Sequence, residues 1–133
     1  MIDFVIDSSA LIELATSAKP EPDLYSRART GTGAAPELVD LETLHVLRSM
    51  RRRGRLTPAA ADAAAARLAQ VPLARVTHRS LLTRVWELRD VLTAYDAAYV
   101  ALAEQLGVPL LTCDARIGRA HGHDAAVVVY PSS

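Results

Sequence analysis

The sequence predicts an α/β fold in which helices cover both faces of a parallel sheet. Two observations support this prediction. Short apolar runs, typical of buried strands, alternate with longer segments of helical periodicity, and glycine, proline and capping residues separate them. The strands are predicted over residues 2–6, 34–35, 73–76, 108–112 and 125–130.

The helices are predicted from the longer periodic segments. They are expected over residues 8–17, 23–29, 36–53, 57–70, 80–91 and 94–106. Pro36 suits the first turn of its helix, since that position needs no backbone N–H donor, and Gly54 is the stop signal. Thr57 and Thr93 are expected to cap the helices that follow them, and Gly107 to end the last helix.

Length and composition exclude several classes of protein. A chain of 133 residues is expected to form a single domain over residues 1–133. The 15 basic and 15 acidic residues balance, so any contact with a polyanion has to be local. Cys113 is the only cysteine, which excludes an internal disulfide. With no signal-peptide pattern and no membrane-length apolar run, a cytoplasmic location is expected.

Four acidic residues lie where a soluble protein normally places apolar ones. Asp7 and Asp114 follow strand-like runs, so both are expected at the carboxyl edge of the sheet, where ligands bind in open parallel sheets. Glu42 and Asp96 lie within apolar stripes of their helices. Simpler interpretations exist. Asp7 and Asp114 could be helix caps, Glu42 could be partly exposed or paired with a nearby arginine, and Asp96 could form a capping box with Thr93.

Together the four acids predict a metal site. Carboxylates brought together without a cation repel one another, and their pKa values rise. Mg2+ or Mn2+ suits a set of oxygen ligands that contains no sulfur. Such an ion can activate water and stabilise the charge that builds on a phosphoryl group.

Four segments carry a resemblance to a known family. In order along the chain they read VIDSSALI, PELVDLETLHVLR, YDAAYVALAEQLG and LLTCDAR. They resemble the PIN-domain ribonucleases, specifically the VapC-type toxins of bacterial toxin–antitoxin pairs, over nearly the whole chain. The resemblance implies that Asp7, Glu42, Asp96 and Asp114 are the acidic quartet that binds Mg2+ or Mn2+ and hydrolyses RNA phosphodiester bonds.

The same resemblance implies further properties. Ser8, Ser9 and Thr112 match the family's hydroxyl residues and would orient carboxylates or water; their simpler role is to cap helices and end a strand. The fold is expected to be a three-layer α/β/α PIN-like domain. A homodimer and a cognate VapB-type antitoxin are the expected partners. Leu41, Leu44 and Leu47 give the Glu42 helix a second apolar side, which indicates packing against another chain.

Two groups of arginines are candidates for contact with RNA. Arg116 and Arg119 closely follow Asp114 and are the better placed for a phosphate near the metal. A denser cluster lies where a helix is expected to end, a position that favours cations for electrostatic reasons alone; it consists of Arg48, Arg51, Arg52, Arg53 and Arg55.

The rival functions are weaker. A phosphoacceptor receiver domain needs a lysine near its phosphate site, whereas Lys19, the only lysine, lies in an early connection. No glycine pattern for nucleotide phosphates is present. A catalytically silent RNA-binding or protein-interaction domain on the same fold remains the alternative to an enzyme.

Overall fold

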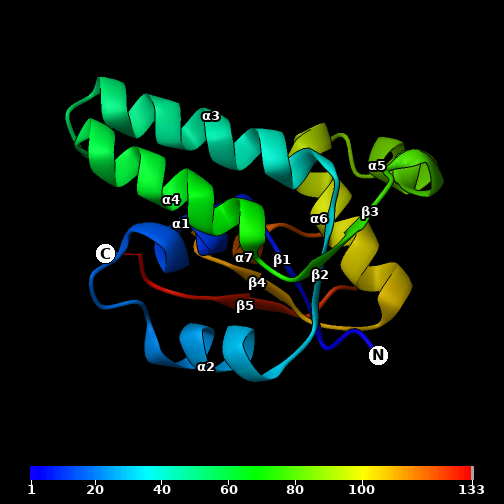
Figure 1. Ribbon diagram of the computed structural model, residues 1–133. Helices are drawn as coiled ribbons and strands as arrows, with labels where there is room; N and C mark the ends of the chain where they lie inside the picture. The colour runs from blue at the N-terminus through cyan, green and yellow to red at the C-terminus, as the bar shows by residue number, and fades with distance from the viewer. Residues whose placement is uncertain (133) are drawn as a thin grey trace.

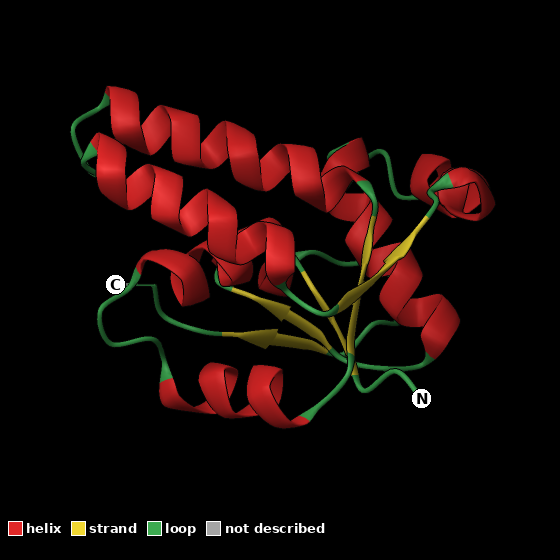
Figure 2. Cartoon of the chain, in the orientation of Figure 1, coloured by secondary structure: helices red, strands yellow, loops and turns green. Residues whose placement is uncertain are grey.

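The computed structural model describes residues 1–132 and confirms a parallel sheet at the centre of the molecule (Figures 1 and 2). The sheet order is β3-β2-β1-β4-β5, and every neighbouring pair of strands is parallel. The strands are β1 (Phe4–Ile6), β2 (Gly33–Pro36), β3 (Leu73–Val76), β4 (Leu110–Thr112) and β5 (Val127–Val129).

Helices enclose the sheet in the three-layer α/β/α arrangement expected from the resemblance. They are α1 (Ser8–Thr16), α2 (Pro22–Thr30), α3 (Leu38–Arg52), α4 (Pro58–Gln70), α5 (Leu82–Glu87), α6 (Ala94–Leu106) and α7 (Ala115–Arg119), with a 3-10 turn η1 (Arg79–Leu81). Figure 1 shows α3 and α4 side by side above the sheet and α2 below it. Helix α6 packs against β1, β2 and β4, and α1 contacts β4, α3 and α4.

Two predicted helices differ from those observed. Pro36 is the buried last residue of β2 and not part of α3, because the ladder to β3 continues through it: Pro36 pairs with Val76, and the Glu37 N–H donates to the Val76 carbonyl at 2.9 Å. The helix predicted over residues 80–91 is only η1 and the short α5. Helix α5 ends at Glu87, and turns replace the rest of the predicted helix: the N–H groups of Val91 and Leu92 both donate to the Leu88 carbonyl at 3.0 Å.

Helix caps that are visible in the sequence are confirmed. Thr57 accepts a hydrogen bond from the Ala60 N–H at 3.1 Å, and Thr93 accepts one from the Asp96 N–H at 3.1 Å. Gly107 ends α6 with a φ of 66°, a left-handed conformation that glycine adopts without strain. No helix within residues 1–132 is long and apolar enough to cross a membrane.

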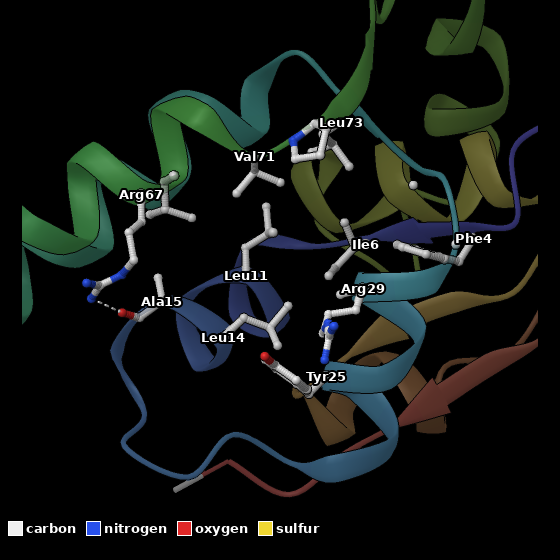
Figure 3. Close-up of a pocket in the computed structure, with 15 residues that line it drawn as sticks. Phe4, Ile6, Leu11, Leu14, Ala15, Tyr25, Arg29, Arg67, Val71 and Leu73 are labelled. Atoms are coloured by element: carbon white, nitrogen blue, oxygen red, sulfur yellow. Dashed lines mark hydrogen bonds between the residues drawn. The ribbon is translucent and has the colours of Figure 1, made fainter.

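An apolar cavity of about 250 Å³ lies near the amino ends of the first three strands. Figure 3 shows Leu11 and Leu14 of α1, Tyr25 of α2 and Leu73 of β3 lining it. It is closed at one side by Arg67, which donates to the Ala15 carbonyl at 2.6 Å. None of the four acids lines this cavity.

Candidate active site

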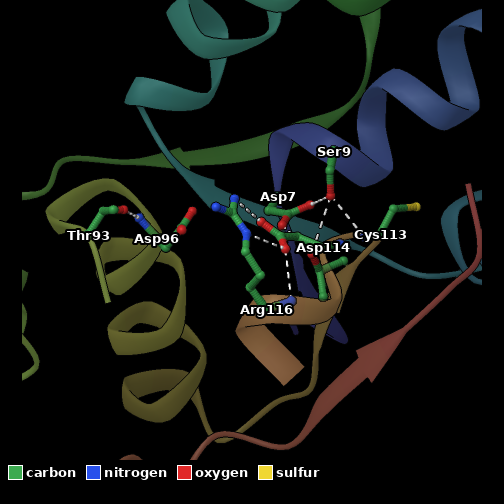
Figure 4. A network of polar contacts seen from close by, with 8 residues as sticks. Asp7, Ser9, Thr93, Asp96, Cys113, Asp114 and Arg116 are labelled. Atoms are coloured by element: carbon green, nitrogen blue, oxygen red, sulfur yellow. Dashed lines mark hydrogen bonds and ion pairs between the residues drawn. The ribbon is translucent and has the colours of Figure 1, made fainter. Parts of the chain in front are cut away.

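All four acids are positioned by elements that begin or end at the carboxyl edge of the sheet. β1 and β4 are neighbours, with Ile6 opposite Leu111, so Asp7 and Asp114 follow adjacent strand ends. Helix α3 starts directly after β2 and carries Glu42 in its second turn, and Asp96 lies in the first turn of α6. Figure 4 shows Asp7, Asp96 and Asp114 around one region.

Asp7 is the most buried of the four, with 4% of its surface exposed. It caps α1, accepting a hydrogen bond from the Ala10 N–H at 3.0 Å. Ser9 donates to the same carboxylate at 2.7 Å, and the hydroxyl of Thr112 donates to its other oxygen. Two hydroxyls and a backbone amide therefore fix the direction of this carboxylate before any ligand arrives.

Asp114 also caps a helix, so the capping interpretation is correct for both strand-end acids. Its carboxylate accepts from the Arg116 N–H at 2.9 Å. The Arg116 guanidinium then forms a fork on both carboxylate oxygens, at 3.1 and 2.8 Å. Because the Arg116 side chain is 78% exposed and that of Asp114 21%, this ion pair lies at the surface.

Glu42 is half-buried and has a partner that the sequence did not indicate. The Tyr99 hydroxyl donates to Glu42 at 2.5 Å. Tyr99 is 1% exposed and lies one turn after Asp96 on α6, so it links the helices that carry the two acids. The simpler interpretation is correct in that Glu42 is partly exposed, but no arginine forms an ion pair with it among residues 1–132. The available signal was a tyrosine inside an apolar stripe, since a buried hydroxyl needs a partner.

The electrostatics show that the acids act on one another. Burial raises the pKa of Asp7, Glu42 and Asp96. The charge of Asp96 raises the pKa of Asp7 and of Glu42 further, and the charge of Asp114 does the same to Asp96. Asp114 is the exception: hydrogen bonds from Arg116 lower its pKa. The negative charges of Asp7, Glu42 and Asp96 are thus not neutralised by a neighbouring cation, whereas that of Asp114 is neutralised by Arg116.

The acids are not arranged as a closed ion site. Among residues 1–132, no three His, Cys, Asp or Glu side chains could hold a metal ion as they stand. The contacts above give the physical reason, because Asp114 turns to Arg116 and Glu42 to Tyr99 while like charges repel. The donor set itself suits a hard divalent cation: oxygen ligands only, with raised pKa values that a cation would lower.

The remaining predicted site residues have distinct surroundings. Ser9 and Thr112 contact Asp7, and Ser9 also accepts from the Cys113 N–H at 2.9 Å. Ser8 interacts with Tyr99 rather than with an acid. Arg119 is exposed, and its charge contributes to the lowered pKa of Asp114.

Comparisons with known proteins agree on one family. A family model described as the PIN domain matches residues 4–122. The chain is 43% identical over 118 residues to Ribonuclease VapC3 of Mycobacterium tuberculosis, covering 87% of this chain and 85% of the relative. It is 34% identical over 123 residues to Ribonuclease VapC12 of the same species, covering 92% and 95%. The fold resembles the crystal structure of VapBC2 from Rickettsia felis bound to a DNA fragment from their promoter, with a TM-score of 0.68, 12% identity and coverage of 96% and 98%.

Proposed function

The chain belongs to the PIN-domain family, and we propose that it is a metal-dependent endoribonuclease, the toxin of a VapBC-type toxin–antitoxin pair, acting in the cytoplasm. One observation carries the proposal: four carboxylates at the same edge of the sheet, three of them with raised pKa values. The relatives named as VapC ribonucleases support the reaction class.

In this proposal Asp7, Glu42, Asp96 and Asp114 hold Mg2+ or Mn2+ as catalytic ligands. The chemistry that such an ion supplies is stabilisation of charge on the phosphoryl oxygens and activation of water. The chain's own contribution is to position the ligands. Ser9 and Thr112 hold the Asp7 carboxylate in one direction, and the hydroxyl of Tyr99 holds Glu42.

The test is to sequence the RNA ends produced by the wild type and by an Asp96→Asn variant. Ends that appear only with the wild type and only with added Mg2+ or Mn2+ would support the proposal and identify the substrate. RNA binding without any new ends would instead favour the alternative, a catalytically silent RNA-binding or protein-interaction domain.

Arg116 is proposed to have two successive partners. In the structure Arg116 forms an ion pair with Asp114, and Figure 4 shows its side chain lying between Asp114 and Asp96. Binding of an ion to Asp114 requires this guanidinium to move away. It would then be free to contact an RNA phosphate, a role also proposed for Arg119.

We therefore expect Arg116→Ala to bind Mn2+ more tightly than the wild type. Because exposed ion pairs contribute little, the expected gain in affinity is small, about 1.5- to 5-fold. Calorimetric titration with Mn2+ measures the effect. Arg119→Ala is the matched control, since it removes the same charge without freeing a carboxylate. An equal gain in Mn2+ affinity in both variants would show that the effect comes only from the change in net charge.

The proposed partners are a cognate VapB-type antitoxin and a second copy of the chain. Leu41 and Leu44 of α3 are 74% and 49% exposed, which leaves an apolar flank beside the Glu42 helix available for another chain. Leu47 is 3% exposed, so the prediction that it shares this second apolar side is wrong. Leu82 and Trp86 add further exposed apolar surface on α5, at 48% and 67%.

An antitoxin bound over the acid crevice and the α3 flank is expected to reduce cleavage at least about tenfold, because it would exclude RNA from the carboxylates. The measurement compares cleavage by the free protein and by the complex with saturating antitoxin. Undiminished cleavage in the saturated complex would contradict this mode of inhibition.

A further inference from the structure

A groove of about 570 Å³ runs beside the acid site between α1, α3 and the start of α7. Asp114 and Arg116 line the end nearest the acids. Hydroxyls of Ser9 and Thr16 line the α1 side, and His45 and Ser49 line the α3 side. In contrast to the apolar cavity of Figure 3, this groove is lined by many groups that can donate hydrogen bonds.

One face of α3 connects the acids to the far part of the groove. Glu42, His45 and Ser49 follow one another at spacings of three or four residues, which places them on the same face of the helix, and Arg53, the C-cap residue, continues this spacing. His45, Ser49 and Arg53 line the groove. Glu42 and Arg53 are about three turns apart, or roughly 16 Å along the helix axis. Arg55, just beyond the end of α3, lines the same part of the groove as Arg53.

Arg53 and Arg55 are exposed guanidinium groups without a carboxylate partner among residues 1–132. Four arginines within residues 1–132 do form ion pairs with carboxylates, namely Arg27, Arg75, Arg84 and Arg116. The acids that line the groove are Asp114 and Glu13, and Glu13 is only 5% exposed. The far end of the groove is therefore positively charged.

The structure divides the arginine cluster into two parts. Arg51 and Arg52 lie in the last turn of α3, where cations favour the helix end, and they do not line the groove. Arg53 and Arg55 do line it. The two pairs have the same charge and nearly the same place in the sequence, but only one pair faces the path that leads to the acids.

We propose that this groove binds the RNA strand, and that Arg53 and Arg55 contact phosphates several nucleotides away from the bond that is cut. The inference rests on the proposed nuclease function and adds a substrate-binding subsite to it. Guanidinium groups form strong, forked hydrogen bonds with phosphate, and hydroxyls and an imidazole along the same path can bind further phosphate or sugar oxygens. A strand in this groove would be led directly to Asp114 and Glu42.

The experiment compares two double variants of equal charge. The first carries both Arg53→Ala and Arg55→Ala, and the matched control carries both Arg51→Ala and Arg52→Ala. Binding of a fluorescent single-stranded RNA of mixed sequence is measured in chelator, where cleavage is suppressed, at several salt concentrations. The Arg53/Arg55 variant is expected to bind roughly tenfold more weakly than the control. Its salt dependence should fall by about 1.4 in slope, or about 0.7 for each lost phosphate contact.

Equal binding and equal salt slopes in the two double variants would overturn the proposal. A second outcome would also overturn it: the Arg53/Arg55 variant binds RNA as tightly as the wild type but binds the antitoxin more weakly. That result would assign the groove to the protein partner. With metal present, the Arg53/Arg55 variant is expected to show a raised KM and an unchanged kcat. Failure of the wild type to cut RNA at all would defeat the nuclease proposal instead, while leaving the binding comparison valid.

Discussion

Asp96→Asn is expected to reduce RNA cleavage by at least about a hundredfold while the protein stays folded, since the change removes a charged ligand from the proposed ion site. The backbone N–H of residue 96 still donates to Thr93, so the cap of α6 is retained. Because burial and the charge of Asp114 already raise the pKa of Asp96, the neutral side chain also relieves repulsion in the metal-free protein.

Asp7→Asn is expected to reduce RNA cleavage as strongly as Asp96→Asn does, and to raise the melting temperature of the metal-free chain. Asp7 is 4% exposed, and burial raises its pKa, so its charged form opposes folding at neutral pH. The amide oxygen can still accept from the Ala10 N–H and keep the cap. Asp62→Asn on the exposed side of α4 is the matched control and should leave cleavage unchanged. Equal cleavage by the wild type and both site variants would remove the basis of the nuclease proposal.

The predictable part of the fold was the part with local signals. Thr57, Thr93 and Gly107 mark helix ends by their own chemistry, and each marks an end in the structure. Pro36 was predicted to open a helix, but its pairing with Val76 of β3 makes it the last residue of β2. That pairing is not visible within a short window of sequence, because it joins segments far apart in the chain.

The site divides in the same way. The positions of Asp7 and Asp114 followed from strand ends, since neighbouring parallel strands end at one edge. The Tyr99 contact to Glu42 and the split between Arg51–Arg52 and Arg53–Arg55 required the packing of α6 and the orientation of α3. Helical periodicity predicts which face of α3 carries Glu42, but it does not predict which residues of other elements contact that face.

Helix capping and ion binding are compatible uses of the same carboxylate. A capping carboxylate accepts one or two hydrogen bonds and keeps lone pairs for a cation. Asp7 and Asp114 each use one oxygen on a backbone amide in this way. Ser9 and Thr112 add two hydrogen bonds to Asp7, and the Arg116 guanidinium adds two to Asp114, so an ion at Asp114 would displace that arginine. In the proposed ion site the cap would orient each of these two ligands, so the capping interpretation and the proposed catalytic one are compatible.

Removal of divalent metal is expected to abolish cleavage and to invert the pH dependence of stability. In the metal-free chain Asp7, Glu42 and Asp96 have raised pKa values, so between the ordinary and the raised values the folded state binds more protons than the unfolded state. Its free energy of unfolding therefore falls as pH rises through that window. The lowered pKa of Asp114 acts in the opposite direction, but only at lower pH.

Bound Mn2+ or Mg2+ requires the charged carboxylates, so the stability gained from metal should grow as pH rises over the same window. At a free metal concentration of a hundred times Kd, the gain is about 2.7 kcal/mol. Thermal unfolding in chelator and in Mn2+, from about pH 5 to pH 8, measures both slopes. Asp96→Asn should show little response to Mn2+. Full cleavage in chelator, or a metal response that is the same in this variant as in the wild type, would show that the four acids serve some purpose other than holding an ion.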